Sequence, residues 1–242
     1  MLISHKKKFI FIHIYKNAGT SITASLLKHG TLIDYIVNKR PYNYALSLIN
    51  RIFGLSNNGN EWLTGYRRHE SANKVREKLE PDVWNDFFKF AFVRNPYSHV
   101  ESLYLYILQN PVHKYFSMIN EKSFDEFIAF YCTGKFFLQN EFVCDEKGVV
   151  IVDFIGNVEN IQFDLEKIHK KIGVSYLSEC PFINKSSNVR DESLWKNISQ
   201  NSLILFNSYA NLDFQMFGYK AYNSCQEVCE RSKTPEKNLK TT

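Results

Sequence analysis

The sequence predicts an α/β fold in which a central, mainly parallel β-sheet is flanked by helices in three layers. The main observation is that the apolar run at residues 9–14 and a second strand pattern at residues 88–94, which is apolar apart from Lys89 and Arg94, each lead through a short loop into a helical pattern. Apolar runs without polar alternation are typical of strands buried on both faces of a parallel sheet. The 242 residues, 44% of them hydrophobic, suffice for one domain, which we place at residues 1–222 before a polar, flexible tail at 223–242.

The first apolar run is followed by KNAGTS, residues 16–21, and by a helix that Gly30 can end. A strand, a tight loop and a helix in this order form an anion site of the P-loop-like kind, because backbone N–H groups converge at the positive end of the helix. Lys16, Thr20 and Ser21 add an ammonium and two hydroxyls. The loop is not a Walker A motif, in which the lysine directly follows the second glycine. A plain turn with a solvated lysine is the alternative.

The second strand pattern ends at Arg94 and is followed by Asn95-Pro96 and a helix over residues 97–109. Proline is well tolerated in the first turn of a helix. Arg94 at the strand end and Ser102 on the helix can therefore face one crevice at the carboxyl edge of the sheet, where open α/β sheets bind ligands.

KNAGTS followed by FVRNPYSHVES resembles the two cofactor signatures of sulfotransferases that use 3′-phosphoadenosine 5′-phosphosulfate (PAPS). The matched segments resemble the carbohydrate sulfotransferase family, with the HNK-1/chondroitin and heparan 2-O-sulfotransferases as relatives. The resemblance implies that Arg94 and Ser102 bind the 3′-phosphate. It also implies that the first loop holds the 5′-phosphosulfate through Lys16, Asn17, Ala18, Gly19, Thr20 and Ser21.

His69 precedes a predicted helix at residues 71–79 that Ser71 can cap and Pro81 can stop. The segment from His69 to Pro96 resembles the part of the heparan 2-O-sulfotransferases that joins their acceptor-side histidine to the second cofactor strand. In those enzymes a histidine before this helix acts as the base, so the resemblance implies the same role for His69. His13 is a distant second candidate, because it lies on a strand expected to be buried.

Two later motifs extend the resemblance, which spans residues 9–219. VDFIGNVEN, residues 152–160, resembles the stretch VDFIGRFEN that is common in the family. FINKSS, residues 182–187, matches a family segment whose lysine, here Lys185, can supply a second cation to the phosphates; a solvated loop lysine is the alternative. Most relatives have proline where this chain has Tyr15, which changes the stiffness of the first loop without removing a ligand group. Charge and sequence proximity suggest contacts to an acidic acceptor sugar for Arg67, Arg68 and Arg190.

The remaining patterns predict further elements of the fold. Residues 142–155 look like a β-hairpin. Within them VVIVD, residues 149–153, resembles a Walker B strand, whose aspartate binds magnesium in nucleotide hydrolases. Because the first loop lacks the GK[ST] of a Walker A motif, we interpret Asp153 as a strand-end residue. A helix is predicted up to Ile172, closed by Gly173. Apolar residues at helical spacing over residues 45–53 predict a helix, which either frames an acceptor cleft or belongs to an insertion that packs on the domain.

Composition limits the possible environments and partners. The net charge of +5 fits a phosphorylated cofactor or an anionic glycan, and the chain shows no basic arm, so nucleic acid is not an expected partner. The five cysteines are widely spread and give a poor zinc signal, so we expect reduced thiols and no metal. We see no membrane-spanning run and no cleavage site, which predicts a cytoplasmic enzyme; a Golgi enzyme trimmed before Met1 is the alternative.

The function predicted from these patterns is transfer of the sulfuryl group of PAPS to a carbohydrate hydroxyl, on a capsular or exported polysaccharide or a glycolipid precursor. Histidine takes the acceptor proton and Lys16 neutralises the leaving group. Two alternatives stay open. A P-loop-type nucleotide kinase would need magnesium, and a catalytically silent module would only bind a nucleotide or glycan. The oligomeric state cannot be predicted from the sequence.

Overall fold

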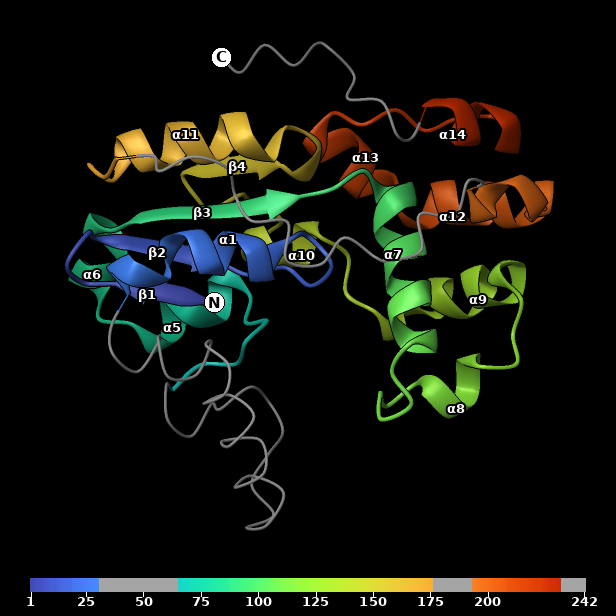
Figure 1. Cartoon of the computed structure of the whole chain (residues 1–242), viewed down its shortest axis with the longest axis horizontal. Helices are drawn as coiled ribbons and strands as arrows, with labels where there is room; N and C mark the ends of the chain where they lie inside the picture. The colour runs from blue at the N-terminus through green and yellow to red at the C-terminus, as the bar shows by residue number, and fades with distance from the viewer. Residues whose placement is uncertain (31–64, 176–192, 232–242) are drawn as a thin grey trace. The chain divides into compact units, whose positions relative to one another are not determined.

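A computed structural model of the chain describes residues 1–30, 65–175 and 193–231 (Figure 1). The chain divides into two compact units. Unit 1 comprises Met1–Val93 and Glu141–Lys185, and unit 2 comprises Arg94–Asn140 and Ser186–Thr242. The predicted helix at residues 45–53, the loop with Lys185, and Arg190 lie outside the described residues.

Unit 1 contains a four-stranded sheet in the order β1-β2-β3-β4 (Figure 1). The strands are β1 (Leu2–Ser4), β2 (Phe9–Ile12), β3 (Phe88–Val93) and β4 (Phe154–Asn157). β2, β3 and β4 are parallel, and β1 pairs antiparallel with β2. The predicted α/β fold with a mainly parallel sheet is therefore confirmed.

Both faces of the sheet are covered, because alternate residues of β2 and β3 point to opposite sides and all of them except the partly buried Phe88 are buried. On one face, Phe9, Phe11, Phe90 and Phe92 pack in one cluster with apolar residues of α1 (Gly19–Leu26) and α11 (Ile161–Lys171). On the other face, Ile10, Ile12, Ala91 and Val93 are also buried. Burial on both faces produces the three layers and explains why β2 is apolar throughout and β3 is apolar apart from Lys89.

The other helices of unit 1 follow the sequence signals with two differences. α5 spans Ala72–Lys78 after Ser71 at the N-cap, and Pro81 does not merely end it but opens a further helix, α6 (Pro81–Asp86). Short 3-10 helices span Leu27–His29 and Val158–Asn160. α10 (Asn140–Val143) crosses the boundary between the units in the sequence.

The predicted hairpin at residues 142–155 is confirmed at its turn and wrong in its extent. The chain turns at residues 145–148, and Cys144 pairs antiparallel with Val150 in an isolated bridge. The strand that follows, β4, pairs parallel with β3 instead of continuing this pairing. The Asp145 carboxylate closes the turn by accepting hydrogen bonds from the N–H groups of Lys147 and Val149. The apolar run does not form a strand, and two of its valines are exposed, Val149 at 56% and Val150 at 39%.

Unit 2 is helical in the described residues. α7 (Pro96–Leu108) begins beside an aromatic cluster in which Tyr97 contacts the rings of Trp195, Phe206, Phe214 and Tyr222. The Tyr97 carbonyl also accepts a hydrogen bond from the Trp195 indole at 3.2 Å. The other elements are α8 (Phe116–Ile119), α9 (Phe124–Phe130), a π-helix at Tyr131–Lys135, a 3-10 helix at Leu194–Asn197, α12 (Gln200–Tyr209), α13 (Asn211–Phe217) and α14 (Cys225–Arg231).

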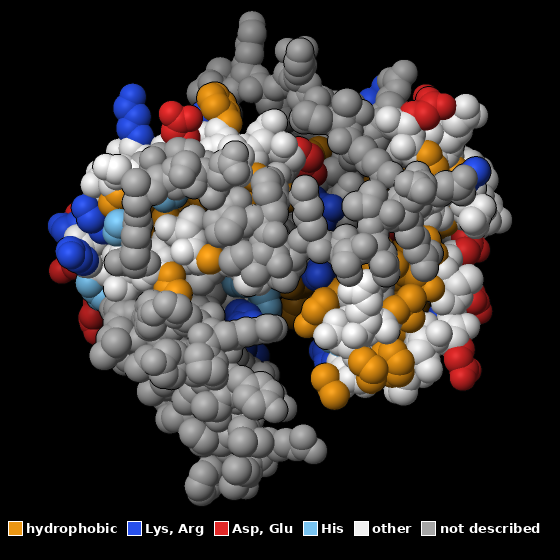
Figure 2. Space-filling model, in the orientation of Figure 1, with side chains coloured by type: hydrophobic (Ala, Val, Ile, Leu, Met, Phe, Trp, Pro, Cys, Tyr) orange, Lys and Arg blue, Asp and Glu red, His pale blue; other side chains and the backbone are white. Residues whose placement is uncertain are grey.

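The surface and the end of unit 2 add two observations. Figure 2 shows hydrophobic side chains gathered at the surface around α8, and Tyr106, Val112 and Met118 are exposed in this part of the sequence. Within residues 223–242, predicted as a tail, α14 buries Val228. No helix in the described residues combines the length and the apolar composition that crossing a membrane requires.

Candidate active site

The loop between β2 and α1 has a backbone suited to binding an anion. Lys16 and Ala18 adopt left-handed conformations, with φ of 63° and 54°, while Asn17 between them does not. Such alternation of backbone handedness turns successive N–H groups toward one side and forms an anion-binding concavity. Each left-handed non-glycine residue costs about 1 to 2 kcal/mol. Strain of this kind clusters at functional sites.

The first turn of α1 adds further donors to this loop. Ala18 is the N-cap residue, no side chain caps the helix, and its first turn contains no acidic residue. The N–H groups that open a helix have no partner within it, and they lie at the positive end of the helix dipole. Thr20 is exposed in this turn, whereas Ser21 is buried. The arrangement fits a phosphate or phosphosulfate group.

Asn17 anchors the loop to the sheet. Its side-chain amide donates a hydrogen bond to the carbonyl of Phe92 on β3 at 2.9 Å, and the residue is 1% exposed. The side-chain amide nitrogen of Asn17 thus stabilises the fold. Asn17 can bind a ligand through its backbone N–H. This bond joins the loop to the strand that leads into Arg94 in the sequence.

Gly19 is required by a close approach of the His13 ring. A Cβ atom at Gly19 would lie 1.8 Å from the Nε2 atom of His13. The His13 ring contacts the rings of Phe11, at 5.7 Å between ring centroids, and His69, at 4.5 Å. Burial, together with the N-terminus, His69 and Arg68, lowers the pKa of His13 well below its usual value. From the sequence, His13 was only a second candidate for the base, and its packing against Gly19 was not predicted.

His69 is held in one tautomer by the backbone. Its Nδ1 atom lies 2.9 Å from the carbonyl oxygen of His13. A carbonyl can only accept, so neutral His69 carries its proton on Nδ1 and leaves the lone pair on Nε2. The ring also makes an edge contact with Tyr15 at 6.1 Å. His69 is therefore prepared to accept a proton at Nε2.

The surroundings of His69 favour its neutral form. Several effects together lower the pKa of His69 to about 4. The largest is desolvation by the surrounding protein, and the positive charges of the N-terminus, Arg68 and Lys16 act in the same direction. The hydrogen bond to the His13 backbone opposes them by raising the pKa. Desolvation and the neighbouring positive charges disfavour the positively charged imidazolium form of His69. The contribution of Lys16 shows that unit 1 brings the loop lysine and His69 into one electrostatic environment.

A buried carboxylate fixes the turn that carries His69. Glu70 is 3% exposed, accepts a hydrogen bond from the Arg67 N–H at 3.0 Å and forms an ion pair with Lys78 at 2.9 Å. The Arg67 and Arg68 side chains are exposed on this turn. Arg67 and Arg68, the two arginines predicted to contact the acceptor, thus belong to the same turn as His69. The sequence did not predict the role of Glu70 in fixing this turn.

Arg94 and Ser102 belong to unit 2 and frame the start of α7. Arg94 is half-buried and follows the last residue of β3. The side chain of Asn95 caps α7 by accepting a hydrogen bond from the Tyr97 N–H at 3.0 Å. Ser102 lies on a partly exposed face of α7, one helical turn after Ser98.

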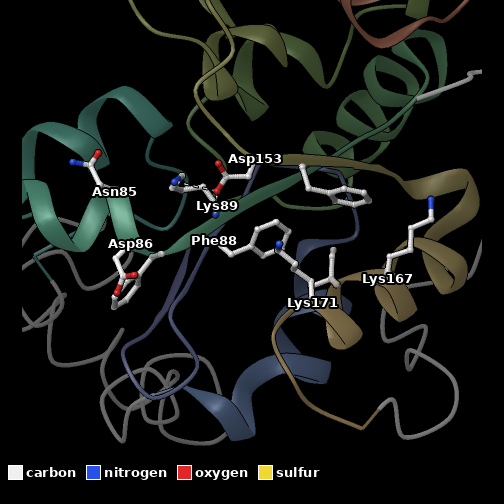
Figure 3. Close-up of a pocket in the computed structure, with 10 residues that line it drawn as sticks. Asn85, Asp86, Phe88, Lys89, Asp153, Lys167 and Lys171 are labelled. Atoms are coloured by element: carbon white, nitrogen blue, oxygen red, sulfur yellow. Dashed lines mark hydrogen bonds and ion pairs between the residues drawn. The ribbon is translucent and has the colours of Figure 1, made fainter. Parts of the chain in front are cut away.

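A pocket of about 580 Å³ in unit 1 lies away from the loop (Figure 3). It is lined by the residues that begin β3 and β4, at the opposite ends of these strands from Arg94 and Asn157. Lys89 and Asp153 form an ion pair there at 3.0 Å. Asp153 precedes β4 and thus lies at the amino edge of the sheet, away from any magnesium site at the first loop. Its interpretation as a residue at the end of a strand is wrong, because residues 151–153 form no strand and Asp153 directly precedes β4.

The described residues contain no group of three or more histidine, cysteine or acidic side chains arranged to hold a metal ion.

Comparison with known proteins identifies the class of protein to which this fold and loop belong. Residues 1–220 match the sequence profile of the sulfotransferase family, so the chain belongs to this family. It is also 34% identical over 103 residues to an uncharacterized protein of Archaeoglobus fulgidus, covering 41% of this chain and 79% of that protein. No solved structure gives a significant match.

Proposed function

We propose that this sulfotransferase moves the sulfuryl group of PAPS to a hydroxyl of a carbohydrate acceptor, with His69 as the base. The observation that carries the proposal is the pairing, within unit 1, of an uncapped anion-binding loop with a neutral histidine whose Nε2 is left as acceptor. Membership in the sulfotransferase family supports sulfuryl transfer in general.

In the proposed reaction, the acceptor oxygen attacks sulfur while the bond from sulfur to the bridging oxygen of the 5′-phosphate breaks. The acceptor proton moves to Nε2 of His69, and adenosine 3′,5′-bisphosphate leaves. A base of this kind contributes about 10²- to 10⁴-fold in rate. The carbonyl of His13 stabilises the imidazolium that forms, because it accepts the hydrogen bond from Nδ1 in both protonation states.

Lys16 meets the charge that develops on the leaving oxygen. Sulfuryl transfer resembles phosphoryl transfer, in which positioning and charge stabilisation supply most of the catalysis. The left-handed backbone at Lys16 and Ala18 orients N–H donors, and the Lys16 ammonium and the amino end of α1 supply positive charge before the reaction begins. Because the leaving group carries less charge than a nucleoside triphosphate, we propose that lysine and backbone donors suffice without a metal.

We assign the 3′-phosphate to Arg94 and Ser102, on the resemblance of their segment to the second cofactor signature. Arginine binds phosphate through a planar pair of N–H donors. A charged hydrogen bond worth about 1.5 to 3 kcal/mol favours a 3′-phosphorylated nucleotide by roughly ten- to a hundredfold. Lys185 remains a proposed second cation for the phosphates.

A carbohydrate acceptor is favoured by the turn before His69. Arg67 and Arg68 expose two positive charges there, which fit a sugar chain that carries carboxylate or sulfate groups. Arg190 is a further proposed contact. The matched segments follow the carbohydrate branch of the sulfotransferases, which makes phenolic acceptors less suitable.

A nucleotide kinase is the competing function, and the position of Asp153 argues against it. A kinase of the P-loop type needs a carboxylate for magnesium close to its phosphate loop. Asp153 instead binds the N–H and the ammonium of Lys89 at the amino edge of β3.

The test is transfer of radiolabelled sulfate from PAPS to a panel of polysaccharides, with simple phenols as competing acceptors. We expect label in acidic polysaccharides, and loss of transfer in His69→Ala. Label only in phenols would overturn the carbohydrate assignment. Transfer that survives His69→Ala undiminished would overturn the role of the base.

A further inference from the structure

We propose that Gln139 and Asp213 form a buried clamp that positions Arg94 and thereby sets the selectivity of unit 2 for a 3′-phosphorylated nucleotide. The inference rests on the proposed function and deepens it. All three residues belong to unit 2. Gln139 and Asp213 are positioning residues that touch the ligand only through Arg94.

The backbone of Arg94 is bonded by a side chain. Arg94 follows the last residue of β3 and directly precedes Asn95, the N-cap of α7. Buried backbone groups without partners are costly. The side chain of Gln139 supplies both partners: its Oε1 accepts from the Arg94 N–H at 2.9 Å, and its Nε2 donates to the Arg94 carbonyl at 2.8 Å.

The carboxylate of Asp213 holds Gln139 in turn. Its oxygens accept hydrogen bonds from the N–H groups of Gln139 at 3.0 Å and Asn140 at 2.8 Å. The Gln139 Nε2 lies 3.5 Å from the same carboxylate. Gln139 is fully buried, and Asp213 is 2% exposed. The aspartate comes from α13, far along the chain, so the clamp is a tertiary feature.

The chemistry allows only one orientation of the Gln139 amide. A carboxylate and a carbonyl both accept, so the amide nitrogen must face Asp213 and the Arg94 carbonyl, and the amide oxygen must face the Arg94 N–H. The reversed amide would set its oxygen against the Asp213 carboxylate and the Arg94 carbonyl, acceptor to acceptor, and its nitrogen against the Arg94 N–H, donor to donor. The clamp therefore fixes the backbone of Arg94 in one conformation, and with it the direction in which the side chain leaves.

A fixed backbone matters because arginine selects phosphate by geometry. The planar guanidinium gains its selectivity from paired hydrogen bonds, and binding costs less when the group is already oriented. The aromatic cluster around Tyr97 holds the next turn of α7 in the same unit. Loss of the clamp should thus weaken recognition of the 3′-phosphate specifically, while leaving contacts to the rest of the nucleotide.

The test compares the affinities of the full-length protein for adenosine 3′,5′-bisphosphate and for AMP by calorimetry. Wild type should prefer the bisphosphate by roughly ten- to a hundredfold. Gln139→Met removes both polar groups at similar volume and should bring this preference to within about threefold of unity, and Asp213→Asn should reduce it partially. Asn140→Ala is the matched control and should retain the preference, because the neighbouring Asn140 holds Asp213 only through its backbone N–H.

The ratio of two affinities separates positioning from folding, because a loss of folded protein lowers the number of binding sites and not the ratio. In transfer assays, Gln139→Met should raise the KM for PAPS and leave kcat at saturating donor nearly unchanged. Equal affinity of wild type for both nucleotides would overturn the proposed 3′-phosphate site itself. A wild-type preference that folded Gln139→Met retains would overturn the clamp alone.

Hydrogen exchange of the wild-type protein keeps the inference testable if the variants do not fold. The Arg94 amide should be protected in the nucleotide-free protein, because Gln139 binds it before any ligand arrives. Rapid exchange of that amide, with protection appearing only on addition of the bisphosphate, would contradict a preformed clamp.

Discussion

Gly19→Ala should destabilise the protein, although alanine is the better helix former. Glycine in a helix is normally about 0.5 to 1 kcal/mol less favourable than alanine. At this position, however, the added methyl would lie 1.8 Å from Nε2 and 2.0 Å from Cδ2 of His13, whereas carbon contacts are ordinarily about 3.5 to 4.0 Å. The ring cannot move freely, since it is 7% exposed and contacts the rings of Phe11 and His69.

Overpacking of this kind costs about 1 to 3 kcal/mol, which exceeds the gain in helix propensity. The assay is urea unfolding of Gly19→Ala, His13→Ala and the double variant. Removal of the ring should make alanine at position 19 harmless, so the cycle should give a coupling energy of about 1 to 3 kcal/mol. Additive effects, or a Gly19→Ala protein as stable as wild type, would refute the packing of His13 against the loop.

The other predictions concern the loop and the base. Lys16→Ala should lower kcat by about 10²- to 10³-fold with little change in stability, as measured by single-turnover transfer and thermal unfolding. His69→Gln should lower kcat by about 10²- to 10⁴-fold while bisphosphate affinity is retained; a matching loss of affinity would contradict its role as base. Asn17→Ala should destabilise by about 1 to 3 kcal/mol, because it leaves the Phe92 carbonyl without this donor; unchanged urea unfolding would contradict the anchor. Since the pKa of His69 is lowered from 6.5 to about 4, the unfolded chain binds a proton that the folded protein does not between these values. Stability should therefore fall as pH drops through this window, less so in His69→Gln, and the pKa on the acid side of the kcat profile should lie below that of free histidine; an inflection near pH 6.5 would contradict it.

The sheet and the phosphate loop could be predicted because their signals are local. An apolar run that is buried on both faces identifies β2 and β3 directly, and the residues after each run fall at the same edge of a parallel sheet. The hairpin predicted at residues 142–155 was right only around its turn. VVIVD has the composition of a strand, but Val149 and Val150 are exposed and the strand forms only from Phe154. Tertiary pairing with β3, which a local pattern does not contain, decided the outcome.

The supporting residues of the site could not be predicted because they act over long sequence distances. His13 and Gly19 are close in sequence, but their approach depends on the loop backbone. Gln139 is 45 residues from Arg94, and Asp213 is 74 residues from Gln139. A glutamine or an aspartate in an ordinary helical pattern gives no sign that it will satisfy a distant backbone group.

Calorimetric titration of the protein with adenosine 3′,5′-bisphosphate, AMP, and ATP with magnesium tests the donor site directly. We predict tight binding of the bisphosphate, weaker binding of AMP by roughly ten- to a hundredfold, and no dependence on magnesium. Tightest binding of ATP with magnesium would contradict this prediction in favour of a kinase. Absence of binding by all three nucleotides would contradict the donor site and point to a module without sulfuryl transfer.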